Sequence, residues 1–210
     1  SLIGVGVNGM RIVDCIFTNN NNAALGNPTG LIYINLAGGS VAMWNCVLGN
    51  NLGPGLYKAN TVSLGLTNCL VYAQTNHGVH VAAGTVSIGN CTIVTNGARG
   101  MTNTAGTVSI RNSIVWGNVL GGVTNCTVFY SDIQNPIAGD HILCVDPRFV
   151  DAATYDFRLR NSSPCLNQGT NETWMAAGID IDGKPRLRQA FVDLGPYETT
   201  ASAGLIIFIR

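Results

Sequence analysis

The sequence predicts an all-β protein that folds as a right-handed parallel β-helix, with coils of about 22 residues and a C-terminal capping segment. Three observations predict this fold. A short motif recurs along the chain at a nearly constant spacing, and a glycine recurs in the same register. The composition is rich in glycine, with 26 residues, while only 10% of the residues are charged. Self-similarity at a fixed period is the signature of a solenoid.

The repeated motif consists of two apolar positions separated by one residue, then Asn and Cys, then a second short apolar run. Its copies begin at Met10, Val41, Leu64, Val86 and Val108, with a weaker copy at Val128. The copies at Leu64, Val86 and Val108 are 22 residues apart. The longer interval after the first copy fits one loop over residues 19–29. The register is therefore kept through most of the first 137 residues.

A glycine opens another short alternating stretch in each repeat. These glycines are Gly30, Gly55, Gly78, Gly100 and Gly122. Short segments that alternate at period two are typical of half-buried strands. Helices are disfavoured because Gly, Asn and β-branched residues fill every repeat. Each coil is therefore expected to contain three short strands.

Stacking of coils at about 4.8 Å would place equivalent residues in columns. Two inward apolar columns are predicted, one of Val41, Leu64, Val86 and Val108, the other of Met43, Leu66, Ile88 and Ile110. A corner column contains Asn45, Asn68, Asn90 and Asn112, where side-chain amides can bond along the axis and accept left-handed backbone. The next column contains Cys15, Cys46, Cys69 and Cys91, followed by Ser113. A packing role is favoured for these cysteines over a metal or redox ladder, and disulfides within the column stay an open question.

Charge argues against several classes of function. Eleven basic and eleven acidic residues give zero net charge, whereas a nucleic-acid binder needs a positive surface. The longest apolar run, Leu205 to Ile209, is too short to span a bilayer. Asp14 is the only acid between residues 1 and 130. This nearly excludes, on the helix face, a hydrolase with paired carboxylates and a lyase that holds Ca²⁺ through carboxylates.

Weak catalytic candidates lie on the expected outer face. Aligning the repeats on their glycines puts Tyr57, His80 and Thr102 in one outward column, and Lys58 follows Tyr57. A Tyr/His/Lys patch could support β-elimination without a metal. The favoured alternative is a sparse set of ordinary surface residues, because no acidic or amide group converges on the patch.

The chain divides into a solenoid over residues 1–137, a cap over 138–198, and a hinge with an apolar terminal strand over 199–210. A cap is expected because the last coil of a solenoid exposes unpaired backbone and an open core. Within it, Asp180 and Asp182 stand as at the start of a calcium loop. Phe191 occupies the position where an EF-hand needs an acid, so that loop is excluded. A β-turn is favoured over a calcium site, and otherwise no cofactor is expected.

The cap also carries five motifs that support a family resemblance. They are Asp146–Asp151, Tyr155–Leu159, Ser163–Gly169, Asp180–Arg186 and Asp193–Glu198. In this order they resemble the closing region of bacterial choice-of-anchor Q proteins, a branch of the pectin-lyase-like β-helix proteins, over about residues 110 to 198. Asn167 replaces the usual Asp and Pro196 the usual Ala. The resemblance implies a secreted or surface-displayed bacterial protein with a β-helix fold, but it implies no reaction.

Two further features bear on assembly. Cys144 and Cys165 could form a disulfide that fastens the cap, which a secreted location would permit. The terminal strand contains Leu205, Ile206, Ile207, Phe208 and Ile209. It is expected either to fold back on its own cap or to be donated to a neighbouring subunit.

The favoured function is that of a non-catalytic extracellular or cell-surface β-helix protein. Its low charge suggests self-association into a structural fibre or layer, or an adhesive subunit, through end-to-end stacking or strand donation. The alternative is a module that binds a carbohydrate or cleaves a polysaccharide as a lyase. No nucleic acid and no membrane span are expected.

Overall fold

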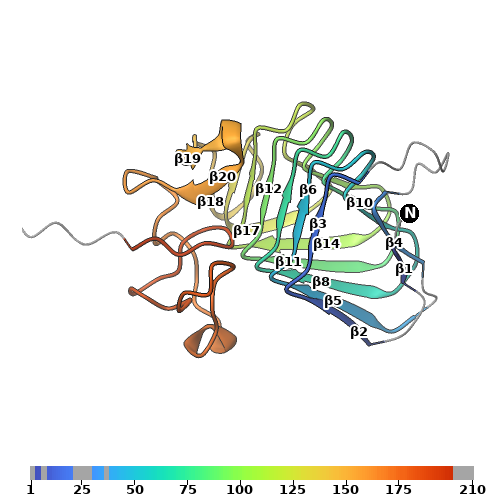
Figure 1. The fold of residues 1–210 in the computed structure, drawn as a ribbon, viewed down its shortest axis with the longest axis horizontal. Helices are drawn as coiled ribbons and strands as arrows, with labels where there is room; N and C mark the ends of the chain where they lie inside the picture. The colour runs from blue at the N-terminus through green and yellow to red at the C-terminus, as the bar shows by residue number, and fades with distance from the viewer. Residues whose placement is uncertain (1–2, 6–8, 21–29, 36–37, 201–210) are drawn as a thin grey trace, which may run out of the picture.

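The computed structural model describes residues 3–5, 9–20, 30–35 and 38–200 and confirms an all-β parallel β-helix (Figure 1). The first sheet contains β1 (Ile3–Val5), β4 (Ile32–Ile34), β7 (Leu56–Lys58), β10 (Val79–Val81), β13 (Met101–Asn103) and β16 (Val123–Thr124). The second contains β2 (Met10–Val13), β5 (Ser40–Trp44), β8 (Ser63–Thr67), β11 (Thr85–Gly89), β14 (Thr107–Arg111), β17 (Thr127–Ile133) and β18 (Gly139–Leu143). The third contains β3 (Ile16–Thr18), β6 (Val47–Gly49), β9 (Leu70–Tyr72), β12 (Thr92–Val94) and β15 (Ile114–Trp116). Strand β17 pairs with both β14 and β15 and so joins the second and third sheets.

The register confirms the predicted columns. Val86 pairs with Leu64 in the coil before it and with Val108 in the coil after it, and all three side chains are buried. The other inward column is equally continuous from Met43 to Ile110. Because the strands pair in parallel at a constant 22-residue interval, equivalent side chains of successive coils stack on one another and fill the interior with aliphatic groups.

The asparagine corner also forms as predicted, because every asparagine in it has left-handed backbone with φ of 51–53°. Asn68 Nδ2 donates to Asn45 Oδ1 at 3.1 Å, so the amides bond along the axis in the early coils. Later coils differ. Asn112 Nδ2 donates instead to the carbonyl oxygen of Thr170, and both amide atoms of Asn90 are buried without a hydrogen-bond partner among the described residues.

The cysteine column has the packing role that the sequence favours. All seven cysteines carry free thiols, and the column thiols donate locally, as Cys69 Sγ does to the carbonyl oxygen of Thr67 at 3.3 Å. Ser113 continues the column and its hydroxyl accepts from the backbone N–H of Cys91. The thiols therefore fill the corner and satisfy backbone groups.

The C-terminal segment differs from the predicted cap in where it packs. Solenoid pairing continues through β18, whose Ile142 packs on the core near the last coil. Residues 144–198, here called the lateral brace, instead lie along the side of the solenoid (Figure 1). The brace contains β19 (Phe149–Asp151), η2 (Ala152–Thr154), β20 (Asp156–Leu159) and η3 (Thr173–Ala176).

The brace spans several coils. The ring of Trp174 lies 5.0 Å from that of Trp44, Asn68 Nδ2 donates to the carbonyl oxygen of Ile179, and the N–H of Gly195 donates to the carbonyl oxygen of Asn112. The physical reason is that the third sheet is apolar on its outward side as well as its inward side, as at Leu70, Val94 and Ile114. A strand that is apolar at consecutive positions must be buried on both faces.

The predicted terminal strand, Leu205 to Ile209, lies outside the described residues. Among the described residues, no helix has the length and apolar character needed to cross a membrane.

Candidate functional site

The outer face of the first sheet carries an aromatic column, defined here as Tyr33, Tyr57 and His80. Tyr57 pairs with Tyr33 and with His80 in the neighbouring coils, and Thr102 pairs with His80. The ring centroids of Tyr33 and Tyr57 are 5.9 Å apart, and those of Tyr57 and His80 are 4.7 Å apart. All of these side chains are half-buried. The structure therefore brings Tyr57, His80 and Thr102 together as the sequence predicted.

Lys58 does not join this column. Its side chain is fully buried, and Nζ donates to the carbonyl oxygens of Asn60 and Ala83. Burial lowers the pKa of the Lys58 ammonium group because desolvation disfavours the charge. The predicted Tyr/His/Lys patch is thus corrected, since Lys58 fixes a turn inside the solenoid. The alternation of side chains along a strand could have predicted this orientation. Lys58 directly follows Tyr57, which points outward, so the Lys58 side chain must point inward.

His77 extends the aromatic column sideways. Its ring lies 5.5 Å from that of His80, and its Nδ1 accepts a hydrogen bond from the backbone N–H of Arg99 at 3.2 Å. Burial is the main cause that lowers the pKa of both histidines, so both imidazoles are neutral at pH values near 7. The column therefore presents aromatic faces and neutral polar atoms. Lys58 is turned inward, whereas the charge of Arg99 acts on His77 and helps to lower its pKa.

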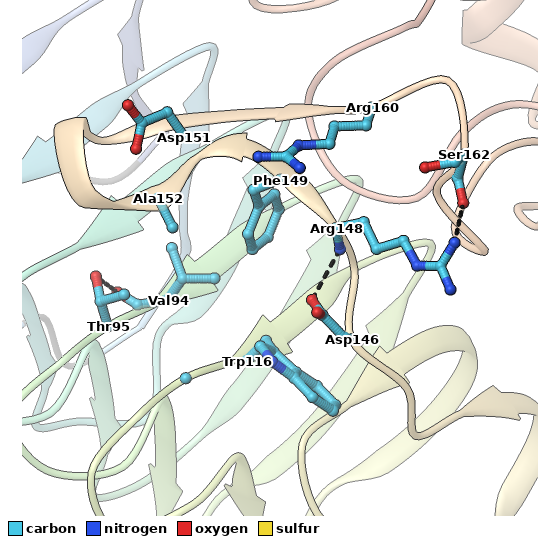
Figure 2. Close-up of a pocket in the computed structure, with 11 residues that line it drawn as sticks. Val94, Thr95, Trp116, Asp146, Arg148, Phe149, Asp151, Ala152, Arg160 and Ser162 are labelled. Atoms are coloured by element: carbon cyan, nitrogen blue, oxygen red, sulfur yellow. Dashed lines mark hydrogen bonds between the residues drawn. The ribbon is translucent and has the colours of Figure 1, made fainter.

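A separate pocket of about 410 Å³ lies between the β19–β20 hairpin and the third sheet (Figure 2). Trp116 and Val94, at the ends of β15 and β12, come from the solenoid. Phe149, Arg148 and Arg160 come from the brace. The sequence analysis missed this pocket, because it forms only where the brace packs on the third sheet.

The two metal candidates form a turn. Asp180 Oδ1 accepts from the backbone N–H groups of Asp182 and Lys184, and its Oδ2 accepts from that of Glu198. Asp182 pairs with Lys184 Nζ at 3.2 Å. Within the described ranges, no group of three or more His, Cys, Asp or Glu residues is placed to hold a metal ion. The loop is built as the favoured β-turn, and calcium binding here stays a prediction.

The predicted disulfide between Cys144 and Cys165 is not formed. Cys144 is exposed and its Sγ donates to the carbonyl oxygen of Gln134, whereas Cys165 is buried and its Sγ donates to Asp132 Oδ2 at 3.3 Å. The two thiols thus have different partners. Packing of Ile114, Leu159 and Leu194 around Cys165 attaches the brace at this point.

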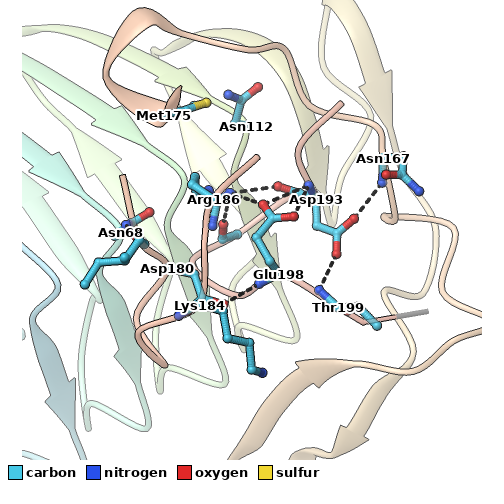
Figure 3. Close-up of polar contacts among 12 residues, drawn as sticks. Asn68, Asn112, Asn167, Met175, Asp180, Lys184, Arg186, Asp193, Glu198 and Thr199 are labelled. Atoms are coloured by element: carbon cyan, nitrogen blue, oxygen red, sulfur yellow. Dashed lines mark hydrogen bonds and ion pairs between the residues drawn. The ribbon is translucent and has the colours of Figure 1, made fainter. Parts of the chain in front are cut away.

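A buried ionic cluster organises the brace (Figure 3). Arg186 Nη2 donates to the carbonyl oxygens of Asp193 and Gly195, and it lies 3.2 Å from Glu198 Oε1. Asp193 accepts from the backbone N–H groups of Asn167 and Thr199. Three of the five family-like motifs thus contribute residues to one structural centre.

The buried acids predict how stability depends on pH. Desolvation raises the pKa of Glu198 to about 8 and that of Asp132 to about 6. Both folded-state values lie above the unfolded ones, so the folded protein binds more protons and loses stability as pH rises. We expect the free energy of unfolding to fall between pH about 6.5 and about 8, by up to about 1.4 kcal/mol per pH unit as Glu198 titrates. Below pH about 6.5, the lowered pKa values of His77 and His80 act in the opposite direction. Urea unfolding at a series of pH values measures this.

The control for this pH profile is Glu198→Gln, which keeps the shape of the side chain without its titration. The variant is expected to flatten the profile at its upper end. A wild-type protein whose stability rises steadily to pH about 8 would contradict the assignment.

Comparison with protein-family models, with curated proteins and with solved structures finds no match to this chain.

Proposed function

We propose that this chain is a non-catalytic, adhesive β-helix module of a secreted or cell-surface bacterial protein, and that it binds a glycan along the first sheet. The aromatic column is the observation that carries this proposal. Its rings follow one another along the solenoid axis as sugar units follow one another along a glycan. Tyrosine and histidine offer an apolar face to a sugar ring and a polar tip to its hydroxyls. The resemblance to choice-of-anchor Q and pectin-lyase-like proteins supports the extracellular bacterial setting.

The chemistry of the column favours binding over cleavage. A hydrolase needs two neighbouring carboxylates, whereas a lyase needs a base and a cation that neutralises the uronate. Neutral His80 could act as a base, but Lys58, the cation predicted beside it, points into the core. The alternative function is that of a polysaccharide lyase. An assay for the formation of unsaturated uronate from acidic glycans tests it.

Tyr57→Ala is expected to weaken glycan binding by about three- to tenfold, because one stacking aromatic ring contributes about 0.5–1.5 kcal/mol. Affinity electrophoresis of the purified chain in gels containing pectin, alginate, xylan or a β-glucan measures the change. Tyr130→Ala is the matched control, since Tyr130 also stacks on a histidine, His141, but lies on β17. Equal weakening by both variants, or no retardation of the wild-type protein in any gel, argues against the column as a glycan site.

Self-association is the second proposal, in which copies of the chain build a surface fibre or layer. Two neighbouring apolar side chains favour it, because Val119 and Leu120 are 72% and 58% exposed between β15 and β16. Sedimentation velocity over a range of concentrations, with negative-stain microscopy, tests this. If the protein is a monomer at every concentration, the self-association proposal is wrong, and the glycan-binding proposal is unaffected.

A further inference from the structure

The pocket between the β19–β20 hairpin and the third sheet has the composition of a sugar site. Trp116 and Phe149 are half-buried and contribute aromatic surface, while Arg148, Arg160, Asp146 and Asp151 contribute polar groups (Figure 2). Its volume of about 410 Å³ is within the range of about 300–1,000 Å³ that is usual for small-molecule sites. Apolar walls with a few convergent polar groups are what such sites share.

The arginines have unused donors. Arg160 Nη2 donates to the carbonyl oxygen of Val150, and Arg148 Nη1 donates to that of Ser162. No ion pair joins either guanidinium to a carboxylate in the part of the chain that the structure describes. Each therefore keeps N–H groups for a ligand, in the planar fork that matches a carboxylate.

The pocket's own carboxylates are held by backbone. Asp146 Oδ1 accepts from the N–H of Arg148 at 2.9 Å, and Asp151 Oδ1 accepts from the N–H of Ala153 at 3.1 Å. In Figure 2 the Asp151 carboxylate points away from the aromatic rings, whereas the Arg160 side chain reaches across toward Phe149. Asp146 and Asp151 thus stabilise the local backbone and do not pair with the guanidinium groups of Arg148 or Arg160, which stay available to a ligand.

Arg148 is held in an uncommon backbone conformation. Its φ is 55°, in the left-handed region that side chains other than Gly, Asn and Asp seldom adopt. The hydrogen bond from its N–H to Asp146 stabilises this turn.

We propose that this pocket binds one acidic sugar unit, a hexuronate, with its ring against Trp116 and its carboxylate on Arg160. The site is independent of the aromatic column, because it lies on the third sheet and uses none of the same residues. It would give the module a second binding site. This site would recognise the negative charge of a sugar, whereas the aromatic column would recognise the apolar faces of sugar rings.

Isothermal titration of the full chain with sodium galacturonate and sodium glucuronate tests the proposal, with galactose and glucose as neutral controls. The wild-type protein should bind at least one hexuronate and bind the matching neutral sugar about tenfold more weakly or worse, because a charge-assisted contact is lost. Arg160→Gln should lower hexuronate affinity by about tenfold or more. The residue is exposed, so the fold is expected to persist, and circular dichroism verifies that.

Arg158→Gln is the matched control. Arg158 lies in β20, two residues before Arg160, but lines a different concavity with Lys184 and Tyr197. Its replacement should leave hexuronate binding unchanged, as should Tyr57→Ala. The proposal is overturned by any of three results: no hexuronate binds, the neutral sugar binds equally well, or Arg160→Gln binds like the wild type.

Discussion

Replacing Arg186 by methionine is expected to lower the free energy of unfolding by about 3–5 kcal/mol at pH about 9, above the pKa of Glu198, where that carboxyl is ionised. The guanidinium is fully buried and pairs with Glu198, whose side chain is only 3% exposed, so removal of the cation leaves an uncompensated acid. It also removes the hydrogen bonds to the carbonyl oxygens of Asp193 and Gly195. Chemical denaturation at pH about 9 measures the loss.

Two comparisons separate charge from packing in this experiment. Adding Glu198→Gln to Arg186→Met should recover part of the lost stability, because no unpaired charge stays buried. Arg158→Met removes an exposed arginine that pairs with Asp156 and should change stability little. If the double variant is no more stable than Arg186→Met, packing of the long side chain is the cause and the ion pair is not.

Gly78→Ala is expected to cost about 1–3 kcal/mol or more, because the added methyl group has no room. A Cβ on Gly78 would lie 2.7 Å from the carbonyl oxygen of Gly100 in the next coil and 2.6 Å from Ile93 Cγ2. The carbonyl belongs to the stacked backbone and cannot turn aside. The same close approach recurs along the column, since a Cβ on Gly55 would lie 2.8 Å from the carbonyl oxygen of Gly78.

The control for Gly78→Ala is Gly89→Ala. Gly89 ends β11, and a Cβ there would meet nothing within 4 Å. We expect this variant to be neutral or slightly stabilising, because alanine restricts the unfolded chain. The melting temperatures of the two variants, measured under the same conditions, separate the steric clash expected at Gly78 from the loss of backbone freedom that both substitutions share. Equal melting temperatures would falsify the explanation for the glycine column.

Periodicity made the solenoid predictable from sequence, because each coil repeats the same inward positions and the same corner. Val86 and Asn90 can be assigned from spacing alone, since a one-residue slip would turn the whole strand inside out. Lys58 shows the limit of alignment by column. Proximity to Tyr57 in sequence suggested a shared surface, but strand alternation puts the two side chains on opposite faces.

The lateral brace was not predictable from its own sequence, because its position depends on the surface it covers. The signal was present in the third-sheet strands, where Leu70-Val71 and Ile93-Val94 are apolar at consecutive positions. Such strands need cover on both sides. The pocket at Trp116 could not be inferred either, since its residues come from segments that meet only after the brace docks.

The docking of the brace has a consequence for how the protein is made. The contact from Asn68 to Ile179 joins residues 111 positions apart, so the apolar outer side of the third sheet stays uncovered until the last third of the chain has been synthesised. Nascent chains with exposed hydrophobic strands are prone to aggregate. We therefore expect the chain to aggregate more readily before the brace has been synthesised than after it has docked on the third sheet.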